Sequence, residues 1–252
     1  MDRFSLAGKT AIITGATRGI GLAIAGGYLE AGGNVVVCSR KQENVDQALS
    51  QLQSSSDSLL GIACHVGKTD DVMHLVDRSV ERFGGVDILV NNAGTNPYFG
   101  PIIDSDETAW DKTMDVNLKG PYMLSKACAK KMIERGGGSI INVSSVAGLT
   151  ASSMQGIYSV SKAALIMLTK VLARELGSKK IRANCICPGL IKTQLSQALW
   201  QNEELEKSLT SMKALGRIGT TDELVGAAIY YASDASSFTT GSVIQVDGGM
   251  VI

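Results

Sequence analysis

A tyrosine and a lysine stand four residues apart in the segment Gly156-Ile157-Tyr158-Ser159-Val160-Ser161-Lys162. The apolar pattern around them predicts a helix, on which residues at this spacing share one face, so the phenol and the ammonium can approach one point. A neighbouring cation favours the phenolate and lowers the pKa of the tyrosine towards the range of a general acid or base. Such pairs also occur on many solvated helix faces, so the pair alone does not establish a proton donor.

A second candidate site is the glycine-rich segment Thr14-Gly15-Ala16-Thr17-Arg18-Gly19-Ile20-Gly21, which lies between an apolar strand and a helix. Bare glycine backbone and the free N–H groups of a helix N-terminus can approach a pyrophosphate. A tight turn without a ligand is the simpler interpretation. The position on the first strand-to-helix turn favours a dinucleotide site.

The choice of dinucleotide depends on the end of the second strand, which runs into Ser39-Arg40-Lys41. An NAD-selective site would carry an acidic residue there, to accept from the ribose hydroxyls and to repel the extra phosphate of NADP. Here Arg18, Arg40 and the hydroxyl of Ser39 can converge on a 2′-phosphate instead. We therefore expect NADP(H), against the alternative that Arg40 and Lys41 only decorate a solvated loop.

Apolar strands and amphipathic helices alternate along the chain and position these segments. The expected strands are 9–14, 34–38, 59–64, 86–90, 139–143, 181–187 and 242–246. The expected helices are 20–31, 43–53, 70–83, 108–129 with a new turn or kink at Pro121, 155–176, 203–215 and 220–232, and 54–58 is a polar loop. Continuous apolar strands separated by helices predict an α/β, doubly wound, parallel seven-stranded sheet with helices on both faces.

Composition restricts the partners. Lys plus Arg equal Asp plus Glu at 24 each, without a charge run, so we expect a small-molecule partner rather than nucleic acid or an anionic membrane. Cysteines 38, 64, 128, 185 and 187 show no C-x-x-C spacing, which predicts free buried thiols, no metal site and a reducing compartment. No apolar leader and no bilayer-length apolar run are evident, so we expect a single soluble domain, 1–252, in the cytoplasm.

The glycine spacing of Gly15, Gly19 and Gly21 resembles that of the short-chain dehydrogenase/reductase family, and further segments follow the family's pattern in order. Asn91-Asn92-Ala93-Gly94 resembles the segment that backs the cofactor. Asn117 matches the active-site asparagine, and Ser145, thirteen positions before Tyr158, matches the active-site serine. Pro188-Gly189-Leu190-Ile191-Lys192-Thr193 resembles the segment that holds the nicotinamide carboxamide. The resemblance covers almost the whole chain and implies a Rossmann-like fold.

The resemblance implies a reductase in which NADPH passes a hydride to a ketone carbon while Tyr158 protonates the developing alkoxide. Ser145 would donate a hydrogen bond to the same oxygen, Lys162 would keep the tyrosine acidic and hold the cofactor ribose, and Asn117 would anchor a water that relays protons to Lys162. The implied cofactor-binding residues are Gly15, Thr17, Arg18, Gly19, Ile20, Gly21, Ser39, Arg40, Lys41, His65, Val66, Asn92, Ala93, Gly94, Tyr158, Lys162, Pro188, Gly189, Ile191 and Thr193.

His65 departs from the family's pattern, which usually carries an aspartate that hydrogen-bonds the adenine. Imidazole can donate or accept at neutral pH, so the adenine contact is one interpretation. A structural histidine satisfied by backbone is the other. Val66, whose backbone should face the adenine, is the firmer expectation.

The substrate pocket is expected within a loop at about 190–215 and its surroundings. Its predicted walls are Ser145, Tyr98, Phe99, Met154, Gln155, Leu195 and Trp200, most of which could equally be core or interface. Mostly apolar walls favour ketones, α-dicarbonyls or hydrophobic aldehydes. Local stretches such as 64–68, 96–100 and 110–113 resemble the NADPH-dependent carbonyl and retinal reductases of the family.

Two alternatives remain open. One is a 3-oxoacyl thioester reductase, with Arg135, Lys179 and Lys180 as a carrier-docking patch, and the other is a redox-sensing NADP-binding protein without catalysis. The resemblance also implies a homotetramer, paired through the two long helices near 108–129 and 155–176. The chain ends in Met250-Val251-Ile252 rather than an S-K-L-like tripeptide, so a peroxisomal address is not expected.

Overall fold

The computed structural model describes residues 3–52 and 57–252. A parallel seven-stranded sheet of order β3-β2-β1-β4-β5-β6-β7 forms its centre, which confirms the expected fold. The strands are β1 (Thr10–Thr14), β2 (Asn34–Ser39), β3 (Leu59–Ala63), β4 (Ile88–Asn91), β5 (Gly138–Val143), β6 (Ile181–Pro188) and β7 (Val243–Val246). Strand order reverses at β1, between β2 and β4, so a crevice opens there at the carboxyl ends of the strands.

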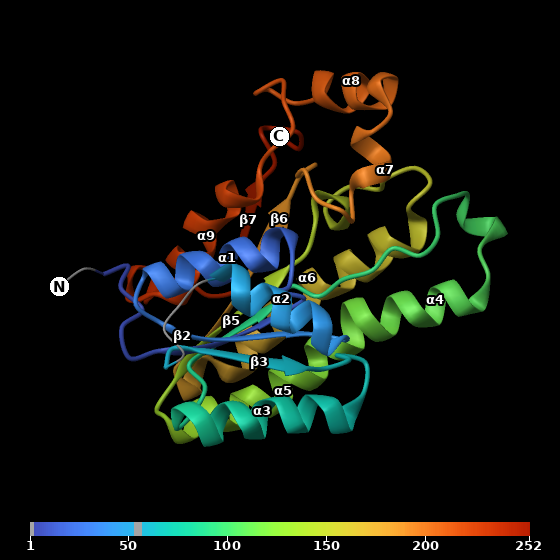
Figure 1. Cartoon of the computed structure of the whole chain (residues 1–252). Helices are drawn as coiled ribbons and strands as arrows, with labels where there is room; N and C mark the ends of the chain where they lie inside the picture. Colours follow the sequence, from blue (N-terminus) through green and yellow to red (C-terminus); the bar gives the residue numbers. More distant parts are fainter. Residues whose placement is uncertain (1–2, 53–56) are drawn as a thin grey trace.

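Helices cover both faces of this sheet (Figure 1). They are α1 (Gly19–Glu30), α2 (Gln42–Leu52), α3 (Thr69–Phe83), α4 (Glu107–Met114), α5 (Gly120–Glu134), α6 (Gly156–Leu176), α7 (Gln197–Trp200), α8 (Glu203–Ser211) and α9 (Val225–Ala232). Helices α7 and α8 stand apart from the sheet, at the top of the view in Figure 1. They form the segment that the sequence placed in the substrate loop.

Two apolar clusters hold the layers together, one on each face of the sheet. Side chains of α1, α2 and α9, such as Ile24, Val45 and Tyr231, pack on one face. Side chains of α3, α5 and α6, such as Leu75 and Leu124, pack on the other. Because both faces are covered, alternate residues of the central strands are buried on opposite sides, and the strands read as continuous apolar runs.

The predicted helix 108–129 differs from what forms. It is divided into α4 and α5 by a turn of π-helix over Asp115–Lys119, and Pro121 lies in the first turn of α5. A proline is tolerated there because the first N–H groups of a helix have no intrahelical partner, so the break comes from the π turn and not from the ring. The wider turn contains Asn117, whose side chain is fully buried.

Other boundaries also shifted. The expected helix 203–215 ends at Ser211, and the short helix α7 forms where only loop was expected. Gln53 of the expected helix 43–53, and residues 54–56 of the polar loop, lie outside the described residues.

The expectation that no apolar run could span a bilayer was wrong for length and composition. Helix α6 with its 3₁₀ extension, Gly156–Lys179, is long and apolar enough to cross a membrane. Its apolar residues have another role here, because 44% of the most apolar stretch is buried inside the protein. A core helix of a soluble protein passes the same test.

Candidate active site

The carboxyl ends of β1, β4, β5 and β6 meet at one edge of the sheet and bring the sequence motifs together. Thr14 links the end of β1 to the end of β4. Its hydroxyl donates to the Val90 carbonyl and accepts from the N–H groups of Asn92 and Ala93, at 3.0 Å each. The Asn92 amide in turn donates to the carbonyls of Thr14 and Gly15. These bonds fix the glycine loop against the end of β4.

Two glycines of the loop, Gly15 and Gly21, lie too close to neighbouring atoms to carry a side chain. A Cβ on Gly15 would lie 2.9 Å from the Ala93 Cα, and one on Gly21 would lie 2.4 Å from Nδ2 of Asn92. Gly15 and Gly19 also have positive φ, +62° and +58°, which favours glycine. The bare backbone at the start of α1 fits the pyrophosphate of the dinucleotide that the sequence predicts.

The predicted ribose-phosphate residues lie at the end of β2 and at the start of α1. Ser39 has a buried hydroxyl that is left without a hydrogen-bond partner among the described residues. A buried polar atom of this kind is costly unless a ligand or water satisfies it, so it fits a nucleotide ribose or phosphate. Arg40 and Lys41 are exposed beside it. Arg18 reaches the other way and donates from Nη1 to Oε1 of Gln194, a partner that the sequence did not suggest.

Tyr158 and Ser145 meet as predicted. Tyr158 lies in the first turn of α6, and Ser145 precedes the 3₁₀ turn Val146–Gly148 at the end of β5. The Ser145 hydroxyl accepts from the N–H of Ala147 at 3.1 Å. Burial raises the pKa of Tyr158 to about 12, and a hydrogen bond with Ser145 opposes part of that rise. The phenol therefore holds its proton at neutral pH, which suits a proton donor.

Lys162 lies one turn further along α6 and is almost entirely buried, with 3% of its surface exposed. Its Nζ donates to the carbonyl of Val143 at 2.9 Å and lies 5.6 Å from the centre of the Tyr158 ring. Burial lowers the pKa of Lys162 to about 8. The expected lowering of the Tyr158 pKa by this ammonium does not appear, because burial has the largest effect on the pKa of both groups.

Asn117 closes the back of the site. Its Oδ1 accepts from the N–H of Thr95 at 2.8 Å, and its Nδ2 donates to the Thr95 carbonyl and to the Ser161 hydroxyl. A Cβ on Gly94 would lie 3.6 Å from both Oδ1 of Asn117 and Nζ of Lys162. The two groups therefore flank one small space, and Oδ1 keeps a lone pair towards a water there. The proton relay stays a prediction.

The segment predicted to hold a carboxamide follows β6. Gly189 packs against the Asp247 backbone, Ile191 is buried, and the Thr193 N–H donates to the Ser196 hydroxyl at 3.1 Å. Ser196 also donates to the Ile191 carbonyl at 2.6 Å, so it shapes the loop although the sequence did not single it out. A Thr-x-x-Ser spacing before a short helix is the signal that could have found it.

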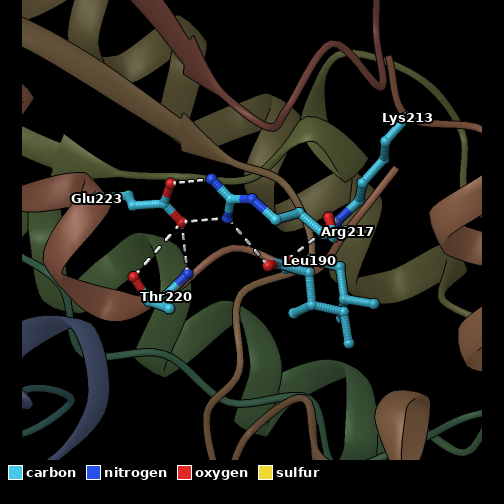
Figure 2. Close-up of polar contacts among 6 residues, drawn as sticks. Leu190, Lys213, Arg217, Thr220 and Glu223 are labelled. Carbon is cyan, nitrogen blue, oxygen red and sulfur yellow. Dashed lines mark hydrogen bonds and ion pairs between the residues drawn. The ribbon is translucent and has the colours of Figure 1, made fainter. Parts of the chain in front are cut away.

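A second set of contacts holds the base of the substrate loop (Figure 2). Lys213, 5% exposed, donates from Nζ to the carbonyl of Leu190 at 3.1 Å and to that of Arg217 at 3.4 Å. The Arg217 guanidinium pairs with both carboxylate oxygens of Glu223, at 2.9 and 2.6 Å. Glu223 also accepts from the N–H of Thr220 at 2.8 Å. Burial lowers the pKa of Lys213.

The predicted substrate walls fall into two groups. Phe99, Met154 and Leu195 are exposed apolar side chains on three separate segments, which follow β4, β5 and β6. Among the described residues, Met154 and Lys180 are the only ones other than glycine that have a positive φ. The Met154 carbonyl accepts a hydrogen bond from the N–H of Gly100. This bond ties the segment that ends in Gln155 to the segment that carries Phe99.

Tyr98 and Trp200 have structural partners as well. The Tyr98 hydroxyl donates to the Pro101 carbonyl at 2.8 Å. The Trp200 indole N–H donates to the Thr193 carbonyl at 3.0 Å, and the Lys192 ammonium lies 5.0 Å from its ring centre. Trp200 therefore connects α7 to the carboxamide segment, and its ring makes a cation–π contact with Lys192.

His65 has the contacts of a structural residue. Its Nδ1 accepts from the N–H of Gly67 at 3.1 Å, and its own N–H donates to Asp71. Val66 beside it is buried. The backbone-satisfied interpretation of His65 therefore holds in this structure, and an adenine contact stays a prediction.

The cysteines are free and buried, as expected. Cys185 and Cys187 point to the same side of β6, with their Sγ atoms 3.9 Å apart. Cys187 lies close enough to Tyr158 to contribute to the rise of the Tyr158 pKa. This cysteine, which the sequence predicted only as a buried thiol, therefore borders the active site.

Residues 15–251 match the family model described as enoyl-(acyl carrier protein) reductase. The chain is 46% identical over 247 residues to dehydrogenase/reductase SDR family member 4 of Homo sapiens, covering 98% of this chain and 89% of that protein. It therefore shares almost its whole length with that relative.

Two solved structures are also similar. One is a gluconate 5-dehydrogenase from Burkholderia cenocepacia J2315, in complex with NADP and tartrate: 37% identical, TM-score 0.94, covering 99% of this chain and 97% of that one. The other is a short-chain type dehydrogenase/reductase from Mycobacterium marinum: 36% identical, TM-score 0.93, covering 99% and 98%.

Proposed function

The chain belongs to the short-chain dehydrogenase/reductase family, and from this premise we propose that it is an NADPH-dependent reductase of ketones, dicarbonyls and hydrophobic aldehydes. The observation that carries the proposal is the Ser145–Tyr158 pair at the carboxyl end of the sheet, with Lys162 buried behind it. The bound dinucleotide supplies the hydride in reduction and accepts it in the reverse reaction.

The protein's own groups handle the proton and the charge. Tyr158 donates its phenolic proton to the substrate oxygen as negative charge develops there, because the phenol is still protonated at neutral pH. Ser145 accepts from the N–H of Ala147, so its own hydroxyl proton, which serves the hydrogen bond with Tyr158, can also be donated to the same substrate oxygen. The two donors together orient the carbonyl and stabilise the alkoxide.

Lys162 supports the phenol. When protonated, its ammonium stabilises the phenolate that remains after the proton has been donated. The Val143 carbonyl and the walls of the site hold Nζ in place, and the side of Nζ that faces Gly94 stays open towards a ribose hydroxyl or a water. Lys162 thereby connects the proton donor with the nucleotide site.

The preference for NADP(H) over NAD(H) is part of the proposal. Arg40 and Lys41 follow Ser39, whose buried hydroxyl has no hydrogen-bond partner among the described residues, Arg18 lies in the glycine loop, and no acidic residue stands at the end of β2. A 2′-phosphate would satisfy the hydroxyl and face the cations. Measuring kcat/KM with both reduced nucleotides tests this, and equal or better turnover with NADH would contradict it.

The substrate class follows from the mouth of the site. The segments that follow β4, β5 and β6 carry exposed apolar side chains, namely Phe99, Leu149, Met154, Leu195 and Met212. Apolar walls favour lipophilic carbonyl compounds over phosphorylated or acidic ones. The deciding experiment is a panel of aryl ketones, diketones and aliphatic aldehydes, assayed with NADPH beside acetoacetyl thioesters and 5-ketogluconate.

Two results in that panel would change the assignment. Preference for acetoacetyl thioesters would support a 3-oxoacyl thioester reductase, which shares only an acyl-thioester substrate with the enoyl-(acyl carrier protein) reductase that describes the matching family model. Binding of NADPH without turnover of any carbonyl would support a nucleotide sensor. Arg135 and Lys180, two of the three expected carrier-docking residues, border the amino ends of the strands, which does not favour the thioester candidate.

The assembly and the location are proposals too. The outer faces of α5 and α6 expose Tyr122, Ile133, Val160, Met167 and Val171, which supports pairing of these helices in a homotetramer. Sedimentation as a monomer would contradict it. The five free thiols support a reducing compartment such as the cytoplasm, and fractionation of cells tests that.

A further inference from the structure

A second cavity lies at the amino ends of the central strands, at the opposite edge of the sheet from Tyr158. Its volume is about 220 Å³. Its charged lining residues are Lys9, Asp87, Arg135, Lys180, Arg182 and Asp234, and Gly136, Gly137 and Gly138 form one wall. Four cations and two carboxylates face this space, so its lining carries a net charge of +2.

The two carboxylates leave most of this positive charge uncompensated. Asp87 pairs with Nε of Arg135 at 2.9 Å and accepts from the N–H of Thr10 at 2.8 Å. Asp234 is exposed and forms no ion pair with the described residues. Among the cations of the cavity, only Arg135 therefore has a carboxylate in contact within the described part of the chain.

Arg182 is the most informative of the four. It is partly buried, and its guanidinium donates only to neutral oxygens, to the Ser236 hydroxyl at 2.6 Å and to the Ser233 carbonyl at 3.2 Å. Burial lowers the pKa of this arginine, and the attraction of Asp234 opposes that shift. A half-buried cation without a carboxylate in contact is costly, and an anion in the cavity would offset the cost.

Lys9 and Lys180 complete the lining. Neither ammonium forms a hydrogen bond or an ion pair with the described residues, although both border the cavity. Lys180 is held by an unusual backbone, with φ +59°, and its carbonyl accepts from the N–H of Gly138. A Cβ on Gly137 would lie 2.6 Å from that carbonyl oxygen, so glycine is required where the chain before β5 passes Lys180.

We propose that this cavity binds a small oxyanion with at least two negative charges, of the class of inorganic phosphate, pyrophosphate or a phosphate monoester. Arg182, Lys9 and Lys180 all line the cavity, and planar guanidinium donors together with two ammonium groups suit the oxygens of such an anion. The volume admits an anion of this size. The site is about one strand length, roughly 16 Å, from the catalytic edge.

The test uses the full chain saturated with NADP(H), so that the nucleotide groove cannot take the anion. Phosphate, pyrophosphate and glycerol phosphate are titrated separately by calorimetry, with sodium chloride holding the ionic strength constant. Saturable binding of one anion per chain is expected for at least one of the three. The anion with the lowest Kd shows whether the cavity prefers a free inorganic ion or the phosphate group of a larger molecule. No saturable binding in any arm would overturn the proposal.

Variants locate the site. Lys180→Gln should weaken the binding about fivefold or more, because one charge-assisted contact is lost. Lys179→Gln removes the same charge from the preceding residue, which does not line the cavity, and should leave the affinity unchanged. Lys9→Gln, on the other side of the cavity, repeats the test if the first variant is poorly folded. Equal affinity in Lys180→Gln, Lys9→Gln and the control would overturn the assignment of the site.

Discussion

The wall that carries the chemistry and the loop that covers it are built in different ways. In the wall, Ser144 bonds the Lys162 carbonyl, Lys162 bonds Val143, and both side chains are at most 4% exposed. In the loop, Leu195 and Leu215 are 59% and 65% exposed. Polar contacts concentrate near its two ends instead, at Ser196 and at Lys213.

The difference separates two demands on the enzyme. Burial fixes the proton donor and shifts its pKa, because a desolvated group cannot relax into water. A covering segment with exposed apolar side chains gains its packing only when a substrate lies beneath it. We therefore expect changes in the wall to affect turnover and changes in the loop to affect apparent affinity.

The largest effect should come from the wall. Tyr158→Phe removes the proton donor and should lower kcat for carbonyl reduction by about a thousandfold, while the Kd for NADPH changes by less than about twofold. Stopped-flow turnover and nucleotide titration measure the two quantities. Tyr122→Phe, at an exposed tyrosine of α5, is the matched control. More than a tenth of normal turnover in Tyr158→Phe would show that the proton comes from elsewhere.

The second prediction tests the same wall through pH. Burial lowers the pKa of Lys162 to about 8, so the ammonium loses its proton as pH rises through that value in the enzyme without ligand. The value of kcat/KM for reduction should then fall about tenfold per pH unit above 8, because the developing phenolate loses its neighbouring charge. A flat profile up to pH 10 would mean that the charge of Lys162 is not needed.

The third prediction turns to the loop. Lys213→Met keeps the length of the side chain but removes its bonds to the carbonyls of Leu190 and Arg217. The loop should then lose its position, raising KM for the carbonyl substrate about tenfold or more, with a smaller change in kcat. Lys207→Met, at an exposed lysine of α8, is the control. If both variants behave alike, or if kcat falls instead of affinity, the separation between wall and loop is wrong.

The smallest effect concerns the other end of the loop. Gln194→Ala removes the hydrogen-bond partner of Arg18, so Arg18 no longer has to break that bond in order to bind a 2′-phosphate. The Kd for NADPH should tighten about twofold to fivefold, followed through the fluorescence of Trp200 in the neighbouring helix α7. Gln201→Ala, just past that helix, should have no effect. Weaker binding in Gln194→Ala would mean that the contact supports the nucleotide site rather than competing with it.

Local sequence patterns predicted most of the layout. All seven strands and the glycine loop could be placed because buried parallel strands read as apolar runs, and bare glycines mark a close backbone approach. The π turn at Asn117 could not be predicted, since the helical pattern continues through it and the contacts of the asparagine with Thr95 and Ser161 join distant segments. Short helix α7 was missed because four residues carry too little periodicity.

By itself the sequence determined which groups could act: a phenol and an ammonium four residues apart, a serine thirteen positions earlier, and a phosphate-binding turn. Their spacing along helix and strand is a local property that a pattern can express. Only the tertiary structure decided their protonation, because burial among distant elements raises the Tyr158 pKa and lowers that of Lys162. It also decided the partners of Lys213, which the sequence did not single out, and of Arg18, which the sequence assigned to a 2′-phosphate, because both bond to residues of distant segments at the ends of the substrate loop.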